Sequence, residues 1–118
     1  MSDQPPFCRN AETAWEVVGD GVRRQVLGHG TDLMIVRVEF ETDAVGALHH
    51  HPHRQATYVA SGRFEVTIGS ATSLLVTGDC FYPPADVPHG VRALEGGTLI
   101  DVFTPIREDF LGPKLGSS

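Results

Sequence analysis

Residues 33–41 read LMIVRVEFE, and this stretch shows most clearly how the chain folds. From residue 34 on, every second residue is apolar: Met34, Val36, Val38 and Phe40. Two charged residues lie between the last three of them: Arg37 and Glu39. In an extended chain, successive side chains point to opposite sides, so a period of two predicts a β-strand with one buried face.

Similar short β-rich segments recur along the chain. We predict further strands at residues 22–27, 55–60, 63–68, 73–76, 79–82, 90–94 and 98–104. Turn signals separate them at Ser61-Gly62, Gly69-Ser70, Gly78-Asp79 and Gly96-Gly97. The 13 Gly and 8 Pro residues interrupt every window long enough for an ordinary helix. Many short, evenly spaced strands predict an all-β antiparallel sandwich or barrel, with one helical turn at 107–111.

Composition limits the classes of protein that remain. With 118 residues, 41% of them hydrophobic, we expect a single domain over residues 1–118, with a core at about 12–111 and flexible termini. A net charge of −6 without a basic cluster argues against nucleic-acid and anionic-membrane partners. No apolar run approaches the ~20 residues of a membrane span. The start, MSDQPPF, lacks the features of a secretory signal, so we expect a cytoplasmic protein.

Two smaller expectations concern single side chains. Cys8 and Cys80 are too few and too far apart for a disulfide scaffold or a metal-type motif, so we expect free thiols. We expect Cys80 and Trp15 to be core residues.

Histidines gather in one segment. Residues 46–62 read GALHHHPHRQATYVASG, and a further histidine, His89, follows a proline-rich turn. In an extended strand His49, His51 and Gln55 face one side, whereas His50 and Arg54 face the other. His53 shares the first parity, but Pro52 bends the chain, so its place stays open. A solvated, nonspecific histidine tract is the alternative interpretation.

The residue types in this cluster predict a metal site. Imidazole binds zinc, copper, iron and nickel, and an amide oxygen adds a neutral hard ligand. Because this set has no carboxylate, the charge of a bound dication is not offset. Such a cation polarises a bound oxygen more strongly than one that faces a glutamate.

These motifs resemble those of the cupins, small jelly-roll barrels. The first cupin motif, G-x5-H-x-H-x3-E-x6-G, matches His49, His51 and Gly62 in spacing, with Asp43 in place of the first Gly and Gln55 in place of Glu. The second, G-x5-P-x-G-x2-H-x3-N, matches Gly78, Pro84 and His89 in spacing, with Asp86 and Ala93 in place of its second Gly and its Asn. The resemblance spans residues 15–111 and implies a cupin-type antiparallel jelly-roll barrel.

A narrower likeness is carried by WEVVGDGVRRQVLG, DLMIVRV, VGALHHHPHRQATYVASGRFEV and GDCFYPPADVPHGVRALEGGTLIDVFTPIREDFL. These segments resemble the pectin-degradation cupins of the KdgF family. That resemblance implies ring opening of 4,5-unsaturated monouronates, from pectin or alginate, to linear 4-deoxy-5-keto uronate. It implies one divalent transition metal (zinc, nickel, iron or manganese) on His49, His51, Gln55 and His89. It implies catalytic roles for Asp101, Phe103 and Arg107.

Two of these residues also stand out without the resemblance. Asp101 interrupts the apolar run Leu99–Phe103, where a carboxyl group is costly to bury without a partner. An ion pair with a nearby arginine is the structural alternative to a proton-transfer role. Arg107 alone resembles a surface residue, but with an acidic sugar it becomes a candidate carboxylate clamp. Arg54 stands where the family often has Glu. If it faces outward, as its parity suggests, the change is neutral for catalysis.

Other functions of cupins fit the same residues. A cupin of this type can be a metal-dependent dioxygenase, a polyketide cyclase with His53 as a fourth histidine ligand, or a non-catalytic sugar-binding protein. The family implies a small acidic sugar as substrate and a homodimer as the assembly.

Overall fold

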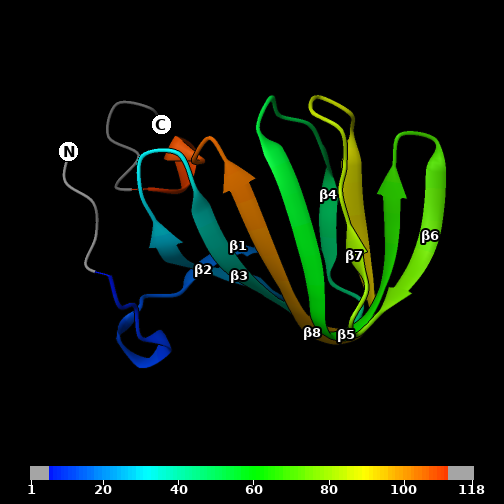
Figure 1. The fold of residues 1–118 in the computed structure, drawn as a ribbon. Coiled ribbons are helices and arrows are strands. Elements are labelled where there is room, and N and C mark those ends of the chain that lie inside the picture. Colours follow the sequence, from blue (N-terminus) through cyan, green and yellow to red (C-terminus); the bar gives the residue numbers. More distant parts are fainter. Residues whose placement is uncertain (1–5, 112–118) are drawn as a thin grey trace.

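The computed structural model describes residues 6–111, and the strands in this range form one antiparallel sheet (Figure 1). The elements are η1 (Asn10–Glu12), β1 (Glu16–Gly19), β2 (Val22–His29), β3 (Met34–Phe40), β4 (Val45–His49), β5 (Arg54–Ile68), β6 (Ala71–Val76), β7 (Cys80–Phe81), β8 (His89–Thr104) and η2 (Glu108–Phe110). The predicted all-β class is therefore confirmed. The expected helical turn near residue 107 is η2. Of the ends predicted to be flexible, residues 1 to about 10 and 112–118, residues 1–5 and 112–118 lie outside the described residues.

The long strands β5 and β8 give the sheet two walls. The first half of β5 pairs with β7 and with the last part of β8, which also pairs with β3. The second half of β5 pairs with β6 and with the first part of β8, which also pairs with β4. Figure 1 shows the sheet curled into a trough, with β1, β2 and β3 along one side and β6 along the other. This is the jelly-roll arrangement predicted from the sequence.

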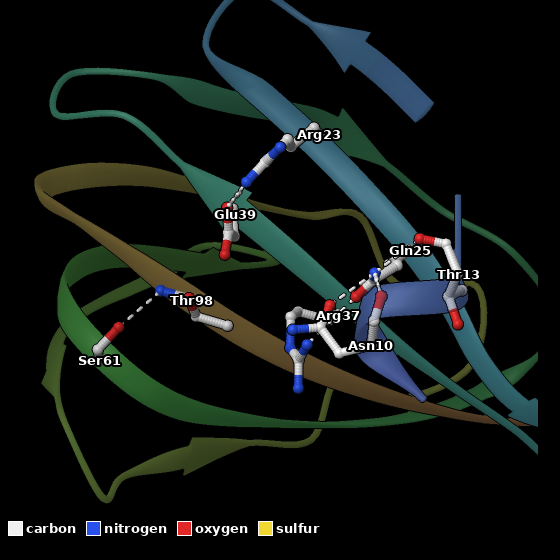
Figure 2. Close-up of polar contacts among 8 residues, drawn as sticks. All are labelled: Asn10, Thr13, Arg23, Gln25, Arg37, Glu39, Ser61 and Thr98. Atoms are coloured by element: carbon white, nitrogen blue, oxygen red, sulfur yellow. Dashed lines mark hydrogen bonds and ion pairs between the residues drawn. The ribbon is translucent and has the colours of Figure 1, made fainter. Parts of the chain in front are cut away.

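The predicted turns at Ser61-Gly62 and Gly96-Gly97 are wrong, because β5 and β8 run through both positions. The pairing register of these strands shifts between Val59 and Phe64, where they bend together. Gly62 has φ +92°, and a Cβ atom at Gly97 would overlap the carbonyl oxygen of Ser61. The glycines therefore allow two backbones to approach at a bend instead of ending a strand. Near this bend the Ser61 hydroxyl accepts a hydrogen bond from the Thr98 amide at 3.0 Å (Figure 2).

Two apolar clusters fill the interior. One cluster is centred on the edge-to-face pair of Phe40 and Phe64, whose ring centroids are 5.3 Å apart. The other contains Met34, Val36 and Phe103, together with Ile106 from the segment after β8. The alternating residues 34–40 thus supply both clusters, as the sequence pattern predicts. A cavity lies between the walls beside these clusters.

The outer face of β2 and β3 holds the N-terminal segment in place. Gln25 is fully buried, and its Nε2 donates to Asn10 Oδ1 at 2.8 Å and to the Thr13 carbonyl at 3.0 Å (Figure 2). Next to it on the same face, Arg23 pairs with Glu39 at 2.7 Å.

Two expectations about single side chains need correction. Trp15 is only half-buried, because it lies under the guanidinium of Arg23 at 3.9 Å rather than in either core cluster. Cys80 is exposed, since the inward position of the short strand β7 belongs to Phe81. Both cysteines are free thiols, as predicted. No helix in residues 6–111 is long and apolar enough to cross a membrane.

Candidate metal centre and cavity

Three histidines from separate elements meet at one end of the trough. His49 ends β4 and pairs in register with His89, the first residue of β8, while His51 lies in the short link before β5. The ring centroids of His49 and His89 are 4.5 Å apart, and those of His51 and His89 are 5.1 Å apart. One nitrogen from each ring lies within 4.8 Å of the others. Such a cluster can hold a divalent metal ion.

Backbone carbonyls orient all three rings. The Nδ1 atoms of His49, His51 and His89 lie 2.9–3.0 Å from the carbonyl oxygens of Ala47, His53 and Val87. Because a carbonyl only accepts, each Nδ1 carries the proton, and each neutral ring presents its Nε2 lone pair. Histidines that bind a metal through one ring nitrogen usually donate the N–H of the other to an acceptor in this way.

Gln55 adds a fourth group to the centre. Its Oε1 lies 2.9 Å from Nε2 of His51 and 3.1 Å from Nε2 of His89. The amide cannot offer its nitrogen instead, since Nε2 of Gln55 donates to the Thr57 hydroxyl at 2.8 Å. When the rings are neutral, the Nε2 lone pairs of His51 and His89 and the Oε1 atom of Gln55 face one another with no proton between them. A bound cation satisfies all of them, so the donor set fits a divalent metal.

Burial favours the neutral histidines that such a centre needs. Burial is the main cause that lowers the pKa of His51 and of His89. The neighbouring His49 and the Arg107 guanidinium lower both pKa values further. Neutral imidazole is the form that binds metal, so the lowered pKa values of His51 and His89 favour metal binding at neutral pH.

Asp101 is linked to this centre through Thr57. Thr57 faces Asp101 across the β5–β8 pair, and its hydroxyl donates to Asp101 Oδ1 at 2.6 Å. The chain of contacts therefore runs from Asp101 through the Thr57 hydroxyl to the Gln55 amide. Burial raises the pKa of Asp101 to about 6, although the hydrogen bond from Thr57 opposes this. The carboxyl group can therefore exchange a proton near neutral pH.

The remaining predicted site residues lie at the same cavity. Phe103 is 2% exposed, and its ring packs edge-on against His51 at 5.8 Å. Arg107 follows β8 and is largely buried, not a surface residue; its guanidinium lies 4.3 Å from the centroid of Phe110. The cavity has a volume of about 340 Å³ and is lined by His49, Gln55, His89, Asp101, Phe103 and Arg107, among others. That volume suits a small ligand.

Three neighbours of the cluster lie outside it. The side chains of His50 and Arg54 are exposed, and Arg54 donates to the Tyr82 hydroxyl at 2.7 Å, so both face outward as predicted. His53 does not belong to the three-histidine group, and its Nδ1 is buried without a hydrogen-bond partner among residues 6–111.

The structure also explains two departures from the cupin motifs. Asp43 and Asp86 occupy motif positions where glycine is usual, and both have left-handed backbones with φ of 72° and 63°. Aspartate tolerates this conformation better than most residues. The Asp86 amide donates to the His51 carbonyl at 2.8 Å, so this turn supports the histidine segment.

Sequence reasoning missed Thr57 and Arg24, which both contribute to the cavity region. Thr57 shares the inward parity of Gln55 two positions earlier. Arg24 lies between Val22 and Val26 on the inward face of β2 and lines the cavity. Strand parity alone was the available signal for both.

Comparison with known proteins agrees with the fold. Residues 36–103 match the family model of the cupin domain. The chain is therefore a cupin. It is 46% identical over 102 residues to the pectin degradation protein KdgF of Dickeya dadantii, which covers 85% of this chain and 93% of that protein. It belongs with the KdgF-like members of the family.

Two solved structures are similar over nearly the whole chain. An RmlC-like cupin from Shewanella frigidimarina has a TM-score of 0.90 at 40% identity, and covers 94% of this chain and 100% of its own. KdgF from a Halomonas species has a TM-score of 0.86 at 40% identity, and covers 92% of this chain and 100% of its own. The jelly-roll architecture is thus shared with experimentally determined cupins.

Proposed function

We propose that this protein opens the ring of 4,5-unsaturated monouronates, released from pectin or alginate, to give linear 4-deoxy-5-keto uronate. One observation carries the proposal: the carboxyl group of Asp101 lines the same cavity as a histidine cluster that can hold a metal ion. The similarity to proteins named for pectin degradation supports the choice of an acidic sugar.

In this proposal one divalent transition metal is held by His49, His51, Gln55 and His89. The lone pairs of these side chains converge, and no carboxylate joins them. When bound, the metal supplies Lewis-acid polarisation of a substrate oxygen. The reaction is an isomerisation, so a metal without redox chemistry, such as zinc, suffices.

The protein's own residues carry the proton and fix the substrate. Asp101 takes the proton from the C1 hydroxyl while the bond between C1 and the ring oxygen breaks, which leaves an aldehyde at C1 and an enolate at C5. The same proton, returned to C4, converts the enolate to the 5-keto group, so atoms and electrons balance. Arg107 pairs with the substrate carboxylate, and Phe103 forms an apolar wall that keeps water away.

The proposal is tested by mixing the metal-loaded protein with an unsaturated monouronate and following the ring alkene by NMR. We expect the alkene signal to disappear faster than in buffer. The variants His49→Ala, Gln55→Ala and Asp101→Ala should slow this loss strongly, while His50→Ala, an exposed neighbour, should not. If the wild type acts no faster than buffer, or all variants match it, the proposal is wrong.

A further inference from the structure

Arg24 is an arginine that faces the interior. It lies on β2 opposite Val38 of β3, between the inward-facing residues Val22 and Val26. Its side chain is 15% exposed and lines the same cavity as His49 and Asp101. A charged group is rarely placed there without a role, because its burial is costly.

Two contacts hold the guanidinium of Arg24 in place. Its Nε donates to an oxygen of Glu16 at 3.0 Å, and its Nη2 forms an ion pair with the same oxygen at 2.9 Å. Its Cζ lies 3.7 Å from the centroid of the Phe110 ring. Within residues 6–111, Nη1 of Arg24 has no hydrogen-bond acceptor. Two N–H groups are thus available to a ligand on a guanidinium that is already oriented.

Arg107 shares the same aromatic ring. Its guanidinium lies 4.3 Å from the Phe110 centroid, so both guanidiniums pack against one ring. Nε and Nη2 of Arg107 are engaged by Asp109 at 3.1 and 2.9 Å, and Nη1 has no acceptor within the described residues. Both arginines line the cavity, and each has the same kind of unused donor.

We infer that Arg24 is a specificity-determining residue that binds the carboxylate of the substrate together with Arg107. The inference rests on the proposed function, since it assumes an acidic sugar in this cavity. A carboxylate has two oxygens and can accept charge-assisted hydrogen bonds from the unused donors of both arginines. A neutral sugar hydroxyl makes weaker hydrogen bonds to the same donors, so the pair selects acidic over neutral sugars.

The adjacent residue gives a matched control. Arg23 also pairs with a carboxylate, Glu39, at 2.7 Å, and its guanidinium also covers an aromatic ring, Trp15, at 3.9 Å. Arg23 faces outward, as Figure 2 shows, and does not line this cavity. Arg24→Gln and Arg23→Gln therefore lose the same kinds of contact, and only one of them loses a cavity donor.

The test measures the binding of two unreactive sugars, galacturonate and galactose, to the metal-loaded variants by calorimetry. We expect Arg24→Gln to weaken galacturonate binding by about 10- to 100-fold, as for a lost charge-assisted hydrogen bond, without weakening galactose binding. Arg23→Gln should bind both like the wild type, and Arg24→Lys should recover part of the loss. In turnover, KM for the unsaturated uronate should rise more than kcat falls.

Several results would overturn the inference. These are a wild type that does not bind galacturonate, an Arg24→Gln variant that binds it as tightly as Arg23→Gln does, and equal losses for both sugars. The outcome is separate from that of the proposed reaction, because galacturonate binding needs no turnover. A wild type that opens rings while Arg24→Gln binds normally refutes only the role of Arg24. Selective loss of galacturonate without any ring opening refutes only the reaction.

Discussion

At the scale of single residues, the Thr57 hydroxyl orients the Gln55 side chain. It has one proton, which it donates to Asp101, so it must accept from the Gln55 amide. That direction turns Oε1 of Gln55 toward the histidines. A side chain that is 1% exposed and does not belong to the histidine cluster thus sets which atom of the Gln55 amide faces the three rings.

Thr57→Val should therefore weaken metal binding by about 10- to 100-fold, the range found when a metal ligand loses the hydrogen-bond partner that orients it. The valine keeps the shape, but the Gln55 amide loses its acceptor and its orientation. Thr57→Ser, which keeps the hydroxyl, should bind metal nearly as the wild type does. Calorimetric titration with zinc measures both. Equal affinity of the valine variant and the wild type would show that Thr57 does not orient Gln55.

Asp101 should make the stability of the metal-free protein depend on pH. Its pKa is raised from 3.8 to about 6, so the folded state holds this proton more tightly than the unfolded chain. The stability gained from that proton is complete below pH 3.8 and is lost as the pH rises through 6. Relative to Asp101→Asn, the wild type should lose about 2–3 kcal/mol between pH 4 and pH 7.5. Urea unfolding of both proteins in the presence of a chelator measures the difference. A gap between them that is independent of pH would contradict the raised pKa.

The sequence predicts the centre better than its surroundings. His49, His51, Gln55 and His89 could be proposed from spacing and resemblance because motif patterns are local in the chain. The partnership of Thr57 with Asp101 joins residues 44 apart, and it depends on a strand register that no local pattern contains. Arg24 was missed for the same reason, since only its parity with Val22 and Val26 marks it as inward-facing.

At the scale of elements, β5 and β8 show that glycine-containing turn signals do not distinguish a turn between two strands from a bend within one strand. Gly62 and Gly97 look like turn residues in sequence, yet in the structure they let two long strands bend together. The strand segments on either side were predicted because alternation is visible locally. Their continuity through the bend was not, since it depends on contact between two backbones distant in sequence.

The close approach of these strands predicts a large effect for Gly97→Ala. A Cβ atom there would overlap the Ser61 carbonyl oxygen, which is backbone and cannot turn aside. We expect the free energy of unfolding to fall by about 3 kcal/mol or more. Gly19→Ala is the control, because its Cβ would meet only Val22 at 3.8 Å. Chemical denaturation compares the two variants. A Gly97→Ala protein within about 1 kcal/mol of the Gly19→Ala protein would show that the bend relaxes easily.

At the scale of the whole molecule, the cavity combines parts that only the complete sheet brings together. Arg24 comes from β2, His49 from β4, Gln55 from β5, and Asp101 from β8. Arg107 comes from the segment after the last strand. No single hairpin contains the donors of the centre, so the site forms only when both walls have closed. Ligand binding and folding are therefore linked.

That linkage predicts that metal stabilises the fold through the histidine cluster. A metal that binds only the folded state, at a free concentration about 100 times its Kd, stabilises a protein by about 2.7 kcal/mol. For a chain of this size, that corresponds to a rise in Tm of roughly 10 °C. We expect calorimetry to show this rise when zinc or nickel replaces a chelator.

Two neighbouring variants separate site binding from nonspecific binding. His51→Ala removes a buried ring of the cluster, so the metal-dependent rise in Tm should largely vanish. His50→Ala removes the next ring in the same run, which is exposed and faces outward, so the rise should stay as in the wild type. If both variants keep the rise, metal binds the histidine run without a defined site. If the wild type shows no rise with any divalent transition metal, the lone pairs of His49, Gln55 and His89 converge for another reason, and the metal centre is wrong.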